Sequence, residues 1–272
     1  MREQLSVFAG GFSLAHVEAV TGFAPLDEID VVDLLSALVD QSMVVAEPGP
    51  DGTTRYRLLE TLRQYGEQAI TTDPTGLATM RDRHLTHFLA RAEHWYAQQA
   101  GAREPEANKA FAANWDNLRA AFDWALSTGR GRAVADLLQA TYWFEFHAGR
   151  REHQDWAVDV LATGTDTGQI ASAAVAVWAV SAQSDAVTQA LALDPAEPDL
   201  EARDVEQIWM AGTNTAFITN DRSELERTAD HAACYENPTW AEASTSATSS
   251  TASNTPRSRA RRPGTTTSKW GA

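Results

Sequence analysis

The chain has 272 residues and a net charge of −15, because 37 Asp and Glu outnumber 22 Lys and Arg. So acidic a chain is not expected to bind nucleic acid unspecifically, since that binding requires Lys and Arg to neutralise phosphates. The single cysteine, Cys234, excludes a disulfide framework and a cysteine-based metal cluster. The longest apolar stretch, at residues 171–182, is too short to span a bilayer, and the first residues lack a signal peptide's apolar region. We therefore expect a cytoplasmic protein with no membrane partner.

The first residues are predicted to form three short helices. A helical stub at Arg2–Phe8 ends at two glycines, and Ser13 is a suitable N-cap for a helix over Leu14–Thr21, with Gly22 just past its end. A third helix, at about Leu26–Gln41, follows. Its apolar residues recur at helical spacing: Ile29, Val32, Leu35, Leu38 and Val39.

A β-hairpin and a fourth helix are predicted next. The β-prone runs Ser42–Ala46 and Thr54–Leu58 flank a Pro/Gly/Asp cluster at residues 48–52, a pattern that indicates a hairpin. Another helix follows and ends near Asp73. Because this order of elements is typical of a winged helix, we predict a winged-helix-like domain over residues 1–73. Its core is expected to contain Leu35, Leu38, Val39, Leu58 and Leu62.

Residues 76–240 are predicted to be helical throughout, starting with helices at Leu77–Ala100, Phe111–Ser127 and Ala133–His147. Three short segments each follow one apolar helix and precede another, and their starts lie 34 and 38 residues apart: Phe146–Gly149, Val180–Gln183 and Ile218–Asp221. This is the period of tetratricopeptide-type helix pairs, which stack on their neighbours. We favour a tetratricopeptide-like repeat array over three unrelated turns.

The composition changes abruptly over residues 241–272. This segment has 14 Ser and Thr, five basic residues and one acidic residue, and no Leu, Ile, Val, Phe, Met or Tyr. Since it lacks the apolar surface needed to offset the entropy of ordering, we expect a disordered tail. The abrupt loss of aliphatic residues favours a frameshifted tail over a genuine basic linker, and translation of the other two reading frames would decide between them.

Several sequence blocks resemble a known family. They are Leu5-Ser-Val-Phe-Ala-Gly-Gly-Phe12, Asp33-Leu-Leu-Ser-Ala-Leu-Val-Asp-Gln-Ser42, Arg55-Tyr-Arg-Leu-Leu-Glu-Thr-Leu-Arg-Gln-Tyr65 and Asp116-Asn-Leu-Arg-Ala-Ala-Phe-Asp-Trp-Ala-Leu126. Together they are similar to the winged helix and the start of the helical-repeat region of bacterial STAND-type ATPase regulators. These include large LuxR-type, antibiotic-regulatory and cyclase-fused regulators. The resemblance implies an ATPase domain before this region. Because the chain begins inside the first winged-helix helix, we expect that domain to be missing.

The lysines argue against an enzyme. A phosphate-binding loop has the pattern Gly-x-x-x-x-Gly-Lys-Ser/Thr, and neither Lys109 nor Lys269 fits it. The glycines of Gly129–Gly131 lie between helices and lack the preceding strand that phosphate motifs need. We predict that the chain is not an enzyme and has no catalytic or cofactor-binding residue, unless a phosphate loop is encoded upstream.

No metal site is predicted either. His84 and His87 are three residues apart, with Glu93 and His94 further along the same helix, but there is no second ligand pair. We therefore interpret them as exposed helix-face residues. Cys234 is interpreted as a small helix residue, and the aromatic run Tyr142–Phe146 as core packing rather than a ligand-stacking site.

The predicted recognition helix is acidic. Helices that dock in the major groove usually carry Arg, Lys, Asn or Gln, whereas Leu26–Gln41 contains five carboxylates and no basic residue. Arg55, Arg57 and Arg63 are ordinary for a solvated hairpin and helix. We therefore expect direct nucleic-acid binding to be unlikely.

The preferred hypothesis is a non-catalytic regulatory or protein-interaction fragment of a STAND-type bacterial transcriptional or signalling regulator. Its partners would be a protein or the ATPase domain, with a possible small effector on the helical repeats. The alternative is a DNA-binding transcriptional regulator that acts through its winged helix.

Overall fold

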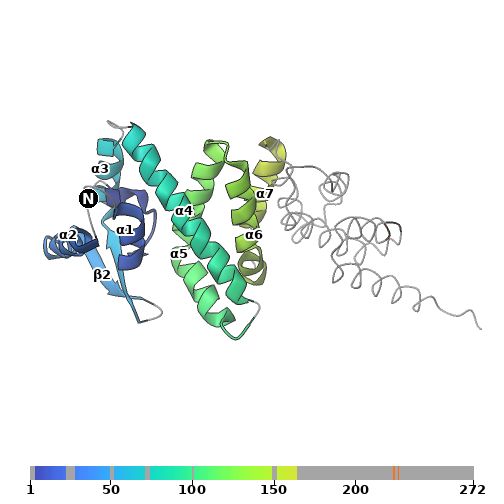
Figure 1. Cartoon of the computed structure of the whole chain (residues 1–272), viewed down its shortest axis with the longest axis horizontal. Coiled ribbons are helices and arrows are strands. Elements are labelled where there is room, and N and C mark those ends of the chain that lie inside the picture. The colour runs from blue at the N-terminus through green and yellow to red at the C-terminus, as the bar shows by residue number, and fades with distance from the viewer. Residues whose placement is uncertain are drawn as a thin grey trace, which may run out of the picture.

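A computed structural model describes residues 4–22, 28–49, 52–70, 74–99, 101–148 and 152–163, together with Ser223 and Glu226. Within these ranges, a small α/β part is followed by a row of longer helices (Figure 1). The fold class predicted from the sequence, mostly helical with a small sheet and a winged helix, is confirmed. The predicted turns at 180–183 and 218–221, Cys234 and the tail at 241–272 lie outside the described residues.

The first part contains a three-stranded antiparallel sheet among short helices. In chain order its elements are η1 (Gln4–Val7), β1 (Phe12–Ser13), α1 (Leu14–Thr21), α2 (Glu28–Asp40), β2 (Val44–Pro48), β3 (Thr54–Leu58) and α3 (Glu60–Ile70). The strand order is β1-β3-β2, with Phe12 opposite Tyr56 and Val44 opposite Leu58. The hairpin was predicted. The short strand β1 was not, and the expected helical stub is a 3-10 helix.

Local signals define the ends of α1 and α2. Ser13 caps α1 as predicted: its Oγ accepts from the His16 backbone N–H, and the His16 ring Nδ1 accepts from the Ser13 N–H. Helix α2 ends where Ser42 takes a φ of 56°, so that the Ser42 and Met43 N–H groups donate to carbonyls of the last helical turn.

The winged-helix core matches the predicted set in part. Leu35 and Leu58 are buried, whereas Leu38, Val39 and Leu62 are half-buried and pack against them. The sequence pattern did not identify the aromatic centre of this core. Phe8 and Phe12 are fully buried with ring centroids 4.6 Å apart, and Phe8 contacts Phe88 from the helical part.

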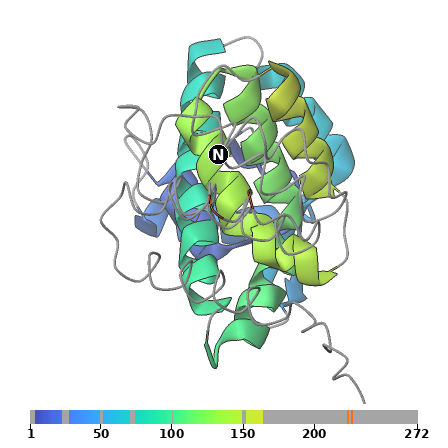
Figure 2. The same ribbon diagram turned by 90° about the vertical axis from the view of Figure 1, so that its right-hand side faces the viewer.

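The second part is a stack of antiparallel helices: α4 (Pro74–Gln99), α5 (Glu104–Ser127), α6 (Gly131–Ala148) and α7 (Glu152–Thr163). Helix α4 packs on α5 and α6, and α7 packs on α6. Figure 2 looks along this stack from the α7 side, with the winged helix behind it. Helix α5 begins seven residues before the predicted start, because Glu104–Ala110 is polar and shows little apolar periodicity.

Stacked aromatic rings hold the later helices together. Phe111 of α5 stacks on Phe144 of α6 at 5.2 Å, and Trp156 of α7 lies between Trp115 and Phe122 of α5. This confirms that the Tyr142–Phe146 run contributes to core packing, since Tyr142 and Phe144 are both buried. Among the described residues, no helix is long and apolar enough to cross a membrane.

Candidate functional site

Helix α2 lies where a helix-turn-helix places its recognition helix. In such a motif the second helix of the pair enters the major groove, and here α1 and α2 form that pair. The exposed side chains of α2 include Asp30, Asp33, Ser36 and Asp40. The helix has no Arg or Lys.

The wing is the β2–β3 hairpin. Its turn is closed by the Gly49 N–H donating to the Thr53 carbonyl at 2.7 Å, and Gly52 takes a φ of +79°, a conformation that favours glycine. Arg57 on β3 is exposed, and its guanidinium lies 3.5 Å from the Glu47 carboxylate. An exposed ion pair of this kind contributes little to stability. Arg57 can therefore leave Glu47 and bind another anion at little cost.

Arg55, on the same strand, has a different role from Arg57. Its Nη2 donates to the backbone carbonyls of Gly11 at 2.5 Å and Ala113 at 2.7 Å, and its guanidinium also contacts Asn114 Oδ1 at 3.3 Å. Arg55 therefore joins the wing strand to α5 and does not lie in the solvated hairpin surface that the sequence suggested.

Asn117 of α5 is the centre of the junction between the two parts. Its side chain is fully buried, and its Oδ1 accepts from the Ala9 N–H at 3.1 Å and the Gly10 N–H at 3.4 Å. Its Nδ2 donates to the Gly11 carbonyl at 3.0 Å. One amide side chain thus satisfies three main-chain groups that precede β1. Asn114 and Asn117 interrupt a broad apolar face of α5, which is the sequence signal that could have identified them.

A second arginine binds the C-terminal end of α1. Arg83 of α4 donates through Nε to the Val20 carbonyl at 2.8 Å and through Nη2 to the Ala19 carbonyl at 2.9 Å. Carbonyls at the end of a helix lack partners within it, so a cation placed there is favourable. The winged helix is therefore held against α4 and α5 at several points.

Three histidines lie at this junction. His84 is 2% exposed and His16 is 7% exposed, and His87 is half-buried. The interpretation of His84 and His87 as exposed helix-face residues is therefore wrong. The His84 ring Nε2 lies 3.4 Å from Asn117 Oδ1 and acts as the donor, since a carbonyl oxygen only accepts. This partner comes from 33 residues away, so helical spacing alone did not predict the burial.

Burial governs the protonation of these histidines. It lowers the pKa of His84 to about 3, although the hydrogen bond that the ring donates to Asn117 acts in the opposite direction. Burial, with smaller contributions from His87 and Arg55, lowers the pKa of His16 to about 3. Burial and the nearby Arg91 lower the pKa of His87 to about 4. All three rings are therefore neutral near pH 7.

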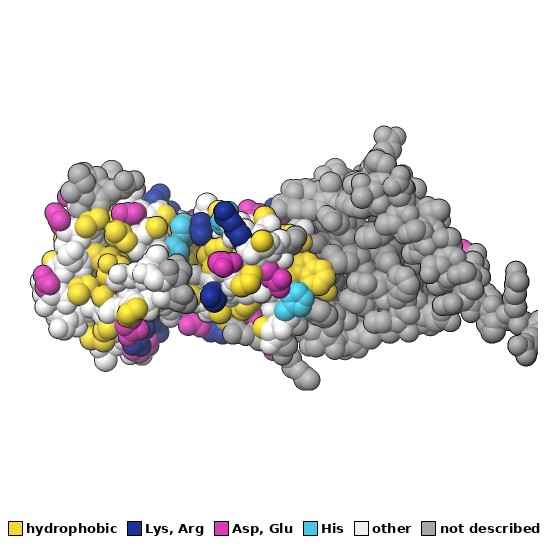
Figure 3. Space-filling view, turned by 90° about the horizontal axis from the view of Figure 1, so that it is seen from below, with side chains coloured by type: hydrophobic (Ala, Val, Ile, Leu, Met, Phe, Trp, Pro, Cys, Tyr) yellow, Lys and Arg dark blue, Asp and Glu magenta, His cyan; other side chains and the backbone are white. Residues whose placement is uncertain are grey.

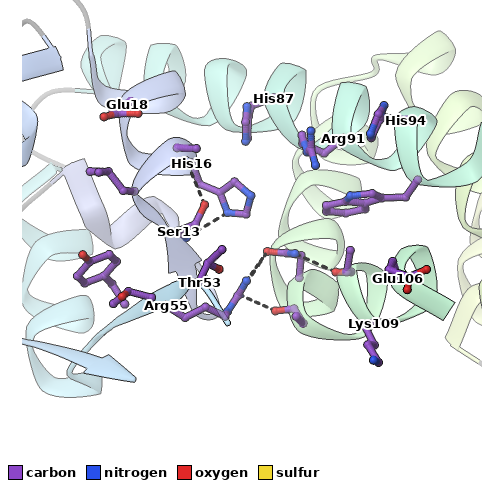
Figure 4. A pocket seen from close by; sticks show the side chains of 18 of the residues that line it. Ser13, His16, Glu18, Thr53, Arg55, His87, Arg91, His94, Glu106 and Lys109 are labelled. Carbon is purple, nitrogen blue, oxygen red and sulfur yellow. Dashed lines mark hydrogen bonds between the residues drawn. The ribbon is translucent and has the colours of Figure 1, made fainter. Parts of the chain in front are cut away.

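A groove of about 1020 Å³ separates the winged helix from the α4–α5 hairpin (Figure 4). His16 and Arg55 line it from the winged helix, His87 and Arg91 from α4, and Lys109 from α5. Figure 3 shows dark blue and cyan side chains gathered near the middle of the described surface, over the helices next to the winged helix. The groove therefore carries several cations.

The remaining candidates from the sequence are scattered. Glu93 and His94 are exposed on α4, apart from the buried His84. Across the described residues, no three His, Cys, Asp or Glu side chains are grouped so that they could hold a metal ion. Lys109 lies inside α5 and lines the groove. Lys269 lies outside the described residues.

Comparisons with known proteins find similarity in the first part of the chain. Residues 3–71 match the family model of the winged helix-turn-helix domain. The chain is 35% identical over 161 residues to "Putative HTH-type transcriptional regulator Mb0914c" of Mycobacterium bovis and to "Putative HTH-type transcriptional regulator Rv0890c" of Mycobacterium tuberculosis strain H37Rv. The aligned region covers 58% of this chain and 18% of each relative, so the chain spans less than a fifth of their length. No solved structure is significantly similar to it.

These findings correct one expectation from the sequence. The winged helix-turn-helix match and the similarity to HTH-type transcriptional regulators point to DNA binding, so the expectation that direct nucleic-acid binding is unlikely is wrong. That expectation relied on the acidic charge of one helix. However, a side chain deep in the major groove meets base edges, and a carboxylate there can accept a hydrogen bond from the cytosine N4 amino group. Phosphate contacts are made by other parts of the domain.

Proposed function

We propose that this chain supplies the DNA-binding domain of a bacterial transcriptional regulator and binds duplex DNA through its winged helix. The observation that carries the proposal is the match of residues 3–71 to the winged helix-turn-helix family, together with the winged-helix strand order β1-β3-β2. Similarity to HTH-type transcriptional regulators over 161 residues supports the same function.

Base and phosphate contacts would come from different elements. The exposed Asp33 and Ser36 of α2 would face base edges, where a carboxylate favours cytosine. The wing would lie along the sugar–phosphate backbone, with the exposed Arg57 contacting a phosphate. With this division, an acidic recognition helix is compatible with DNA binding.

Replacing Arg57 with alanine should weaken DNA binding without affecting folding. We expect the Kd to rise about three- to tenfold. The slope of log K against log salt is negative, and its magnitude should decrease by about 1. Preferred duplexes would first be selected from a random library, and fluorescence anisotropy at several salt concentrations would then give both quantities. Because the Arg57 side chain is mostly exposed, the thermal midpoint should not change.

Arg103 is the matched control, because it is an exposed arginine at the tip between α4 and α5 and is not part of the wing. Arg103→Ala should leave both the Kd and the salt slope unchanged. If no duplex is enriched and the wild-type chain shows no salt-dependent binding, the proposed function is wrong.

We further propose that the chain is part of a STAND-type cytoplasmic regulator with a tetratricopeptide-like helical region after the winged helix. Two of the resembling blocks support this, because Asn117 in the block Asp116–Leu126 binds the main chain of Ala9–Gly11 in the block Leu5–Phe12. The antiparallel stack α4–α7 is also consistent with helix pairs. The gene region upstream tests the proposal, since an in-frame ATPase domain with a phosphate-binding loop is expected there.

We also propose that the chain itself is not an enzyme. Its one lysine within the described residues, Lys109, lies inside a helix and not in a glycine-rich loop after a strand. Purified chain incubated with ATP and Mg²⁺ should release inorganic phosphate no faster than buffer does. Turnover that copurifies with the chain and survives repeated chromatography would contradict this.

A further inference from the structure

Two nitrogen atoms, on residues that line the groove between the winged helix and the α4–α5 hairpin, lack hydrogen-bond partners. His87 Nε2 and Arg91 Nε are buried atoms with no hydrogen-bond partner among the described residues. Both residues line the groove and lie four residues apart, on one face of α4 (Figure 4). Buried polar groups are nearly always hydrogen-bonded, and the Arg91 Nε–H can only donate, so an acceptor is expected beside it. His87 Nε2 can donate to the same acceptor when it carries the ring proton.

The charges around these two donors favour an anion. Arg55, Arg91 and Lys109 line the groove together with two carboxylates, Glu18 and Glu106, so the cations outnumber the anions. Arg91 is also held in place, because its guanidinium lies over the Trp95 ring at 5.2 Å from the centroid. A guanidinium that is oriented but lacks an acceptor on Nε is suited to bind an oxyanion.

We propose that this groove binds a small oxyanion, a carboxylate or phosphate group of a soluble ligand, at His87 and Arg91. The walls come from both parts of the molecule: His16 and Arg55 from the winged helix, and Arg91 and Lys109 from the helical hairpin. A ligand that binds only the folded chain stabilises it against unfolding. This site goes beyond the proposed DNA binding and does not depend on it.

The test uses inorganic phosphate and succinate as probes, titrated separately into the full chain by calorimetry, with NaCl keeping the ionic strength constant. At least one probe should bind saturably at millimolar concentrations, which is the range for a bare anion. The same probe should raise the thermal midpoint. Chloride at equal ionic strength should do neither.

Variants then locate the site. Arg91→Gln should weaken binding of the probe about tenfold, whereas Arg91→Lys should retain part of the affinity as a point charge. The exposed control Arg103→Gln should bind as the wild type does. Since Arg91 Nε has no hydrogen-bond partner among the described residues, Arg91→Gln should fold with a thermal midpoint near that of the wild type.

Three outcomes would overturn the proposal. One is the absence of saturable binding by either probe, and another is equal binding by wild type and Arg91→Gln. The third is loss of DNA affinity in Arg91→Gln without any small-anion binding, because the groove would then serve a DNA phosphate. Failure of DNA binding in all variants would leave anion binding unaffected, so the two proposals fail separately.

Discussion

Replacement of Asn117 by alanine is expected to destabilise the chain by roughly 3 kcal/mol, because it leaves two main-chain N–H groups at the junction without partners and removes one of the two donors to the Gly11 carbonyl. The same change removes the acceptor of the His84 ring. The fully buried position leaves little room for water to replace the lost side chain. Chemical denaturation followed by circular dichroism would measure the free energy of unfolding.

Asn108→Ala is the matched control on the same helix. Asn108 Oδ1 accepts from the Gln99 side chain at 2.8 Å, but the residue is half-exposed, so water can replace the contact. We expect its removal to cost less than about 1 kcal/mol. Equal losses for the two variants would show that Asn117 does not hold the junction together.

Acidification should destabilise the folded chain through its buried histidines. His16 and His84 have a pKa of about 3 in the folded state, against an ordinary value of 6.5. Between these values the unfolded chain binds more protons, so stability falls as the pH drops below 6.5. At pH 5 each ring should reduce the free energy of unfolding by about 2 kcal/mol relative to pH 7.5, or about 4 kcal/mol for the pair.

His84→Gln should reduce this pH dependence by about 2 kcal/mol, because glutamine can still donate to Asn117 but does not titrate. His94→Gln is the control, since His94 is exposed on the same helix. Denaturant melts of the three proteins at pH 7.5 and pH 5 give the comparison. A wild-type free energy of unfolding that is equal at both pH values would contradict the expectation, as would an equal effect of the His94 change.

The elements that the sequence predicted well depend on local chemistry. The α1 helix has an N-cap at Ser13 and a glycine after its end, and the hairpin has a Pro/Gly/Asp turn between two β-prone runs. The third strand, Phe12–Ser13, has two residues, too few for an alternating pattern to appear. It forms because Tyr56, 44 residues later, lies opposite Phe12.

The junction escaped prediction for the same reason. Arg55 and Asn117 look like ordinary surface residues when only their neighbours are considered, because their partners lie 33 to 108 residues away. The burial of His84 follows from Asn117 and the Phe8 ring, which no local periodicity specifies. Direct nucleic-acid binding was misjudged on charge, because one acidic helix was given more weight than the order of elements around it.

Most hydrogen bonds at the junction are made to the main chain rather than to side chains, and this has a consequence for how the sequence of the protein can diverge. Arg55, Arg83 and Asn117 bind the backbone of Ala9–Gly11, Ala19, Val20 and Ala113. Ala9 and Ala19 are exposed, so their side chains should be free to vary between related proteins while the junction persists. Gly11 should not vary, because a Cβ there would lie 3.3 Å from the Arg55 guanidinium. Homologues should therefore keep the three polar side chains and this glycine even where the surrounding surface has drifted.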